Sequence, residues 1–233
     1  MYDPAPQDRG PVSPQDALAC GLLLLLILGL FAADVFSNFH PVKLSALLVV
    51  VFWIPLLALH EAGHALMAAG LGWYVGRIVI GMGRPISRFR VGTAAVEVRM
   101  VPVEGFVVSV PTNLELPSLK SALIYFAGPG IELLLAVILL FAVGPDQMLR
   151  RSDDYGMIVV QSLALAAAAQ GIMNLVPHGI WKDGREIAND GLGIIRSFTW
   201  PQSHFADMIG HRFDDATQEW RREDETGDDW QRR

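Results

Sequence analysis

Two histidines and a glutamate stand within one helical turn of each other, in His60-Glu61-Ala62-Gly63-His64. On a helix, residues four apart share a face, so both imidazoles can reach one metal ion. Glu61 points about 100° away from His60, which suits a carboxylate that contacts a water at the metal instead of the metal. Zinc lowers the pKa of such a water towards about 7, and a carboxylate can take its proton. The segment therefore predicts a hydrolytic zinc site; the alternative is a helix with two structural histidines.

Long apolar runs surround this segment. The chain has 233 residues, 52% of them hydrophobic, with a mean hydropathy of +0.36, which is too apolar for an ordinary soluble domain. The runs are 17–36, 44–73, 121–144 and 157–177, and about 20 apolar residues suffice to cross about 30 Å of hydrocarbon. We predict an all-α polytopic membrane protein with about four transmembrane helices.

The first run, 17–36, has a secretory signal peptide as its alternative interpretation. The flank before it holds Asp3, Asp8 and Asp16 against a single arginine, Arg9, and no clear small-x-small cleavage site follows. A signal peptide requires a positively charged flank. A retained helix is therefore the expectation.

The segment between the second and third runs, 74–120, has a different pattern. Residues 77–80 and 96–100 read as short strands, and Gly92 and Gly105 interrupt the region. We predict a small membrane-associated β-sheet between helices two and three. Residues 1–16 are proline-rich and predict a flexible arm, 17–200 form the membrane-embedded core, and 201–233 form a charged tail predicted to be disordered.

Charge and cysteine content exclude several classes of protein. The net charge is −6, but much of the acid lies in the last thirty residues, so it does not point to a partner. No basic stretch with interleaved aromatic residues indicates nucleic acid binding. The single cysteine, Cys20, excludes an intrachain disulfide and a cysteine-based metal site.

A catalytic zinc ion also needs a third protein ligand and an open position. The candidates are His40, Glu132, His178 and Asp183. With four spans, both termini and the 74–120 loop share one side, and the excess of lysine and arginine on that side places it in the cytoplasm. The fourth run ends on the same side as the histidines, so Asp183 lies at a matching depth and His40 does not. The alternative for Asp183 is a solvated loop carboxylate.

Further segments resemble a known family. Asn174-Leu175-Val176-Pro177 is followed by Asp183-Gly184, and Ala127-Gly128-Pro129 lies in the third run. Together with the His60–His64 segment and the loop 99–107, these residues resemble the site-2 protease family of intramembrane zinc metalloproteases over about 44–190. The chain is similar to a minimal core of that family, without a PDZ or cystathionine-synthase-type domain.

The resemblance implies roles for individual residues. His60, His64 and Asp183 would bind one zinc ion, Glu61 would be the general base, and Asn174 would orient the substrate or stabilise the oxyanion. The alternative for Asn174 is a helix–helix hydrogen bond. The strand region 96–100 would offer an edge to an unwound substrate segment.

Two residues depart from the family pattern. Glu132 stands where the family often has asparagine, and Glu104 stands where a glycine is common. A carboxyl at residue 132 should face the bundle interior. There it would hydrogen-bond to Asn174 or Gln170, or tune the site.

Three functions compete. The first is an intramembrane endopeptidase that cleaves a membrane protein in or near a transmembrane helix, with its active-site side and termini in the cytoplasm. The second is a catalytically inactive zinc-binding scaffold of the same fold, which would not need Glu61. The third is a zinc-handling membrane protein, such as a transporter. Against it, the sequence lacks a second set of polar residues that would lead from the site to the outer face.

Overall fold

The computed structural model describes residues 39–182, 185–214 and 219–222, together with 22, 26, 29–30, 33–34 and 36–37. A 3₁₀ turn, η1 (Pro41–Lys43), leads into α2 (Leu44–Gly70), and the other long helices are α3 (Pro117–Val143) and α5 (Tyr155–Leu175). The short helices are α4 (Pro145–Leu149), α6 (Asp190–Thr199) and α7 (Gln202–Ala206). The strands pair as three hairpins: β1 (Tyr74–Val91) with β2 (Ala94–Val110), β3 (Gly179–Lys182) with β4 (Arg185–Ala188), and β5 (His211–Asp214) with β6 (Glu219–Arg222).

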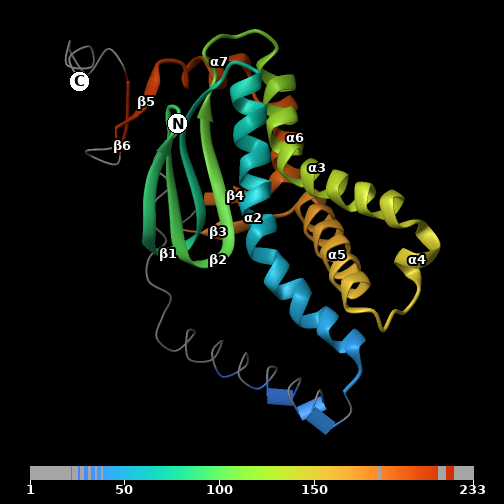
Figure 1. Ribbon diagram of the computed structural model, residues 1–233. Helices are drawn as coiled ribbons and strands as arrows, with labels where there is room; N and C mark the ends of the chain where they lie inside the picture. The colour runs from blue at the N-terminus through green and yellow to red at the C-terminus, as the bar shows by residue number, and fades with distance from the viewer. Residues whose placement is uncertain are drawn as a thin grey trace.

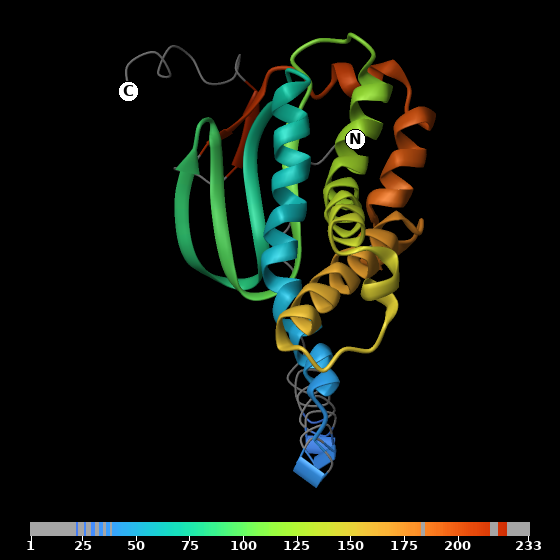
Figure 2. The same cartoon turned by 45° about the vertical axis from the view of Figure 1, so that its right-hand side comes forward.

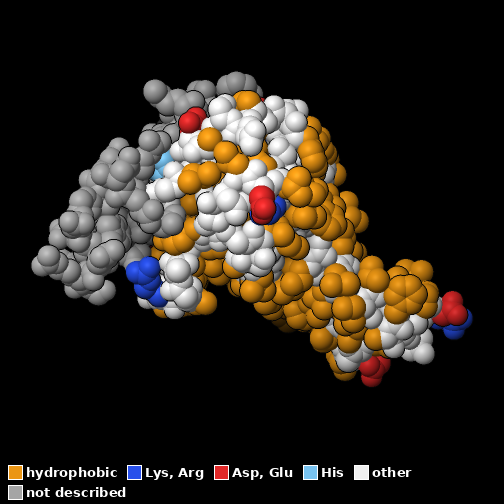
Figure 3. Space-filling view, turned by 90° about the horizontal axis from the view of Figure 1, so that it is seen from above, with side chains coloured by type: hydrophobic (Ala, Val, Ile, Leu, Met, Phe, Trp, Pro, Cys, Tyr) orange, Lys and Arg blue, Asp and Glu red, His pale blue; other side chains and the backbone are white. Residues whose placement is uncertain are grey.

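Three helical segments of the described chain are long and apolar enough to cross a membrane: Pro41–Gly70, Pro117–Val143 and Tyr155–Leu175. Many of their apolar side chains are exposed, such as Val50, Phe141 and Leu165, and hydrophobic side chains dominate the flank formed by α3 and α5 in Figure 3. Lipid is the solvent that such surfaces require. These helices match the second, third and fourth predicted runs and indicate an integral membrane protein. Most of the first run, 17–36, lies outside the described residues.

Helix α2 is the central element, with the β1–β2 sheet on one side and α3 and α5 on the other (Figures 1 and 2). Small residues let the helices approach closely. A Cβ atom on Gly63 would lie 2.7 Å from the carbonyl oxygen of Ala127 in α3. A Cβ atom on Gly171 in α5 would lie 3.0 Å from the carbonyl oxygen of Pro129. The face of α2 that carries His60 and His64 is therefore held against α3.

Prolines lie inside both α2 and α3, at Pro55 and Pro129. Each removes a backbone hydrogen bond and crowds the preceding turn. Both helices change direction along their length in Figure 1. The proline in each helix accounts for this bend.

The predicted strands at 77–80 and 96–100 are present, as parts of one long hairpin that doubles back on itself (Figure 1). Gly81 and Gly83, at the corner of β1, have φ values of 96° and 81°, which only glycine adopts readily. Beyond the corner, residues 87–91 pair with 94–98, while 77–80 face both 105–108 and 95–98. The hairpin thus forms a small sheet from four strand segments.

The expectation that residues 96–100 offer a free edge is wrong for residues 96–98, which are paired on both sides. Val96 has Ile78 as its partner on one side and Phe89 on the other, and Val98 likewise has Ile80 and Ser87. A strand with two neighbours has no free backbone groups to accept another strand. Among the described strands, the segment 105–110 of β2 has a single neighbour, residues 74–80 of β1. Gly105 lies against Glu61 of α2, so this segment is the edge on the side of α2.

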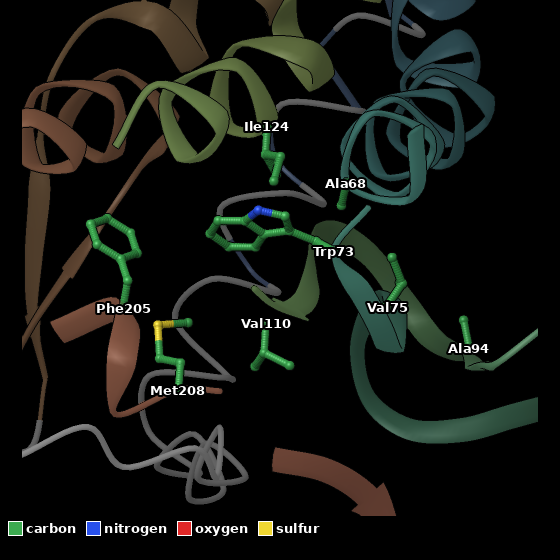
Figure 4. Close-up of a cluster of buried hydrophobic side chains, with 8 residues drawn as sticks. All are labelled: Ala68, Trp73, Val75, Ala94, Val110, Ile124, Phe205 and Met208. Carbon is green, nitrogen blue, oxygen red and sulfur yellow. The ribbon is translucent and has the colours of Figure 1, made fainter. Parts of the chain in front are cut away.

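A hydrophobic cluster joins the sheet, the end of α2, α3 and α7 (Figure 4). Trp73 lies at its centre, with the ring of Phe205 6.4 Å away. Phe205 and Met208 come from the segment assigned by the sequence to the charged tail, yet they are 1% and 7% exposed. The cluster also contains Ile124 of α3, whose backbone oxygen contacts His64. The other members are Ala68, Val75, Ala94 and Val110.

Candidate metal centre

The two histidines of α2 meet at their Nε2 atoms. His60 and His64 are 5% and 6% exposed, and their Nε2 atoms lie 3.0 Å apart. The helical spacing of four residues brings the rings together, as the sequence predicts. Gly128 of α3 provides the space, because a Cβ atom there would overlap the Nε2 atoms of both histidines.

The opposite nitrogen of each ring has an acceptor outside the pair. His64 Nδ1 lies 2.6 Å from the carbonyl oxygen of Ile124, and His60 Nδ1 lies 3.1 Å from Oε2 of Glu132. A carbonyl oxygen only accepts, so Nδ1 of His64 carries a proton. In the neutral rings with Nδ1 protonated, both Nε2 atoms present lone pairs to the same point.

Asp190, the first residue of α6, completes the group. Its Oδ2 lies 3.0 Å from His60 Nε2 and its Oδ1 lies 3.3 Å from His64 Nε2. Burial alone would raise the pKa of this carboxyl, but the adjacent imidazoles of His60 and His64 outweigh that effect and lower the pKa to about 2. Asp190 is therefore ionised at neutral pH, as a metal ligand must be.

The spacing of these atoms fits a zinc ion. Ligand atoms at 2.0–2.1 Å from zinc in a tetrahedron lie about 3.3 Å from one another, and one atom each from His60, His64 and Asp190 forms a mutually close group. Three acceptors that converge at 3.0–3.3 Å repel one another unless protons or a cation lie between them. Two imidazoles and a carboxylate are a frequent donor set for catalytic zinc.

Asn189 positions Asp190. Its side chain caps α6 by accepting from the backbone N–H of Leu192 at 3.1 Å, and it donates to the carbonyl oxygens of Asn174 and Val176 at 3.0 and 2.7 Å. Gly191 allows the first turn of α6 to approach the end of α5, because a Cβ atom there would overlap the carbonyl oxygen of Leu175. The N-terminus of α6 is thereby fixed to the end of the fourth predicted run.

The structure brings together only part of the predicted set. Asp183 lies outside the described residues, and Asp190 occupies the position beside the histidines. Asp190 was missed although Asp190-Gly191 repeats the pair Asp183-Gly184 seven residues later. The preceding Asn189, a residue type that favours helix N-caps, was the available signal.

Asn174 lies half-buried in the last turn of α5. Its backbone oxygen, bonded to Asn189, links it to the segment of Asp190. The expected hydrogen bond of Glu132 to Asn174 or Gln170 is replaced by the bond to His60.

The carboxylate of Glu61 lies against the β1–β2 sheet and is not one of the converging atoms of His60, His64 and Asp190. It is 3% exposed, and its Oε2 has no hydrogen-bond partner among the described residues. A Cβ atom on Gly105 of β2 would lie 2.6 Å from Oε1 of Glu61, so the absence of a side chain at residue 105 lets the carboxylate lie against the strand. A buried carboxylate with an unpaired oxygen is equipped to hold a water molecule.

Residues 46–149 match the family model described as peptidase family M50. The matched segment is therefore similar to the site-2 protease family. The predicted resemblance is thus confirmed for the part that contains His60, Glu61, His64 and Glu132. Site-2 proteases are membrane metalloproteases that carry out intramembrane proteolysis. Among curated proteins, none matches the chain.

Gly128→Ala tests the packing of this candidate metal centre. Because the new methyl group overlaps both Nε2 atoms, we expect zinc affinity to fall at least about tenfold, comparable to the loss of a group that orients a ligand. Competition with a chromophoric chelator measures the affinity. Gly70→Ala, also in a helix but with no atom near its Cβ position, is the control and should bind zinc like the wild type. Equal affinity in both variants would contradict the described packing.

Proposed function

We propose that the protein is an intramembrane zinc endopeptidase that hydrolyses a peptide bond in or near a transmembrane segment of a membrane protein. The observation that carries this proposal is the convergence of His60, His64 and Asp190 beside the unpaired carboxylate of Glu61. Ionisable groups in apolar helices are costly and usually functional. A purely structural role for this group of residues would not account for a buried Glu61 carboxylate with an unpaired oxygen.

His60, His64 and Asp190 are the zinc ligands in this proposal, and Asp183 is the alternative third ligand. A bound zinc ion would polarise the scissile carbonyl and acidify a water molecule. Two imidazoles and a single carboxylate leave the fourth position of a tetrahedron open, as catalysis requires.

Glu61 acts as general base and then as general acid. Its carboxylate accepts the proton of the attacking water and later delivers it to the nitrogen of the leaving amine. Asn174 is proposed to orient the substrate or to stabilise the oxyanion. The position of Asn174 supports this role. Its backbone carbonyl oxygen accepts a hydrogen bond from Asn189, the neighbour of Asp190.

The edge of β2 near Gly105 is the proposed substrate position. A peptide bond within a helix is shielded until the helix unwinds, and an unwound backbone in lipid needs new hydrogen-bond partners. Residues 105–110 pair with β1 on one side only among the described strands, and Gly105 lies against Glu61. A substrate strand added there would have its backbone satisfied while one bond lies next to the base.

The active site is proposed to face the cytoplasm, with both termini on that side. The support is the excess of arginine and lysine in 74–120 and beyond residue 177 over the opposite loops, according to the positive-inside rule. Water would reach the site from that side.

Reconstitution in liposomes with a labelled single-span substrate tests the proposed function. We expect cleavage within or near the span, complete loss of cleavage after chelation, and recovery when stoichiometric zinc is returned. Mass spectrometry locates the cleaved bond. Cleavage that survives complete removal of metal would contradict the zinc mechanism. A protein that binds stoichiometric zinc but cleaves none of a panel of single-span substrates would favour the inactive scaffold.

A further inference from the structure

Glu132 is a fully buried carboxyl group in the membrane-spanning helix α3, with 0% of its surface exposed. Burying a carboxyl group in an apolar environment is costly unless it is hydrogen-bonded. Within a membrane span, such a group marks a function more often than it adds stability. The contacts of Glu132 indicate which function it has.

One oxygen of Glu132 is directed at the metal centre. Oε2 lies 3.1 Å from Nδ1 of His60, and no partner is found among the described residues for Oε1. The other nitrogen of the same ring, Nε2, is the atom that meets His64 and Asp190. The imidazole of His60 therefore lies between the carboxyl group of Glu132 and the proposed metal position.

The two imidazoles are oriented by different kinds of acceptor. For His64 the acceptor is a backbone oxygen, that of Ile124, and the helix fixes its position. For His60 the acceptor is a side chain that comes from the same helix, α3. The hydrogen bond at Nδ1 of His60 thus depends on the length and chemistry of residue 132, whereas the acceptor at Nδ1 of His64 is a backbone atom.

We propose that Glu132 is a positioning residue for His60. Its Oε2 accepts the hydrogen bond of Nδ1–H, which keeps the Nε2 lone pair directed at the metal and makes the ring a stronger ligand. This inference rests on the zinc site proposed above and assigns to that site a residue outside its ligand set. It also explains why a carboxyl is tolerated in the core of the helix bundle.

Zinc affinity of purified variants tests the inference. Loss of a group that orients a metal ligand typically costs 10–100-fold in metal affinity, so we expect about that loss for Glu132→Ala. Glu132→Gln keeps the length and an acceptor oxygen, and should bind zinc more tightly than the alanine variant. Glu132→Asp keeps the charge but is one methylene too short for the 3.1 Å contact, and should resemble alanine. Chelator competition supplies the affinities.

Thermal unfolding of the metal-free proteins separates positioning from packing. Ser162→Ala is the control, because Ser162 is also buried (1% exposed), but among the described residues its hydroxyl bonds to Ile158 of its own helix and not to the metal centre. It should lower the melting temperature without changing zinc affinity. Wild-type affinity in Glu132→Asp, or a glutamine variant no better than alanine, would overturn the inference. A wild-type protein that binds zinc but cleaves nothing would overturn the peptidase proposal and leave this test intact.

Discussion

Asp190→Ala is expected to lose zinc while Asp183→Ala retains it. Asp190 has both carboxylate oxygens within 3.0–3.3 Å of the histidine Nε2 atoms, so its removal leaves only two protein ligands. We expect zinc affinity to fall by more than about 100-fold, beyond the 10–100-fold range for residues that only orient ligands. Inductively coupled plasma mass spectrometry of the dialysed proteins measures the zinc content.

The pair of variants is its own control, because both remove one carboxylate from the same short segment. A protein that loses zinc in Asp183→Ala and keeps it in Asp190→Ala would show that the third ligand is the one predicted from the sequence. His60→Ala should lose zinc in either case, which confirms that the assay reports on this centre.

Glu61→Gln is expected to abolish proteolysis and to keep the metal. The amide has the shape of the carboxylate but cannot accept the proton of water, and general acid–base catalysis contributes typically 10²–10⁴-fold. Glu61 is absent from the group of converging ligand atoms, so zinc content should stay at the wild-type level. The rate of substrate cleavage in liposomes provides the measurement.

Glu115→Gln is a suitable control for this experiment, because Glu115 has an exposed side chain outside the spans. It should cleave at the wild-type rate. Undiminished cleavage by Glu61→Gln would refute the assigned base, whereas loss of zinc in that variant would indicate that Glu61 is a ligand.

The features predicted correctly from the sequence depend on local patterns. The spacing of His60 and His64 fixes their relative position on any helix, and hydropathy alone identifies the three long helices. The strands at 77–80 and 96–100 also follow from short-range alternation. Each of these inferences needs only neighbouring residues.

The features that were missed depend on contacts between distant segments. Asp190 reaches the histidines because Asn189 and Gly191 fix α6 to the end of α5, and a sequence does not display that packing. The interior position of Val96 arises because the hairpin turns back at Gly81 and Gly83. Glu132 was correctly expected to face the interior, but its partner His60 lies 72 residues away.

The central claim, that His60, His64 and Asp190 hold one zinc ion, is tested most directly by X-ray absorption spectroscopy of cysteine-substituted proteins. His60, His64 and Asp190 carry no sulfur, so the wild-type protein should show only nitrogen and oxygen ligands at about 2.0–2.1 Å. Asp190→Cys should add one sulfur at about 2.3 Å, and Asp183→Cys should not. A sulfur ligand in Asp183→Cys but not in Asp190→Cys, or a zinc environment without histidine, would contradict the account.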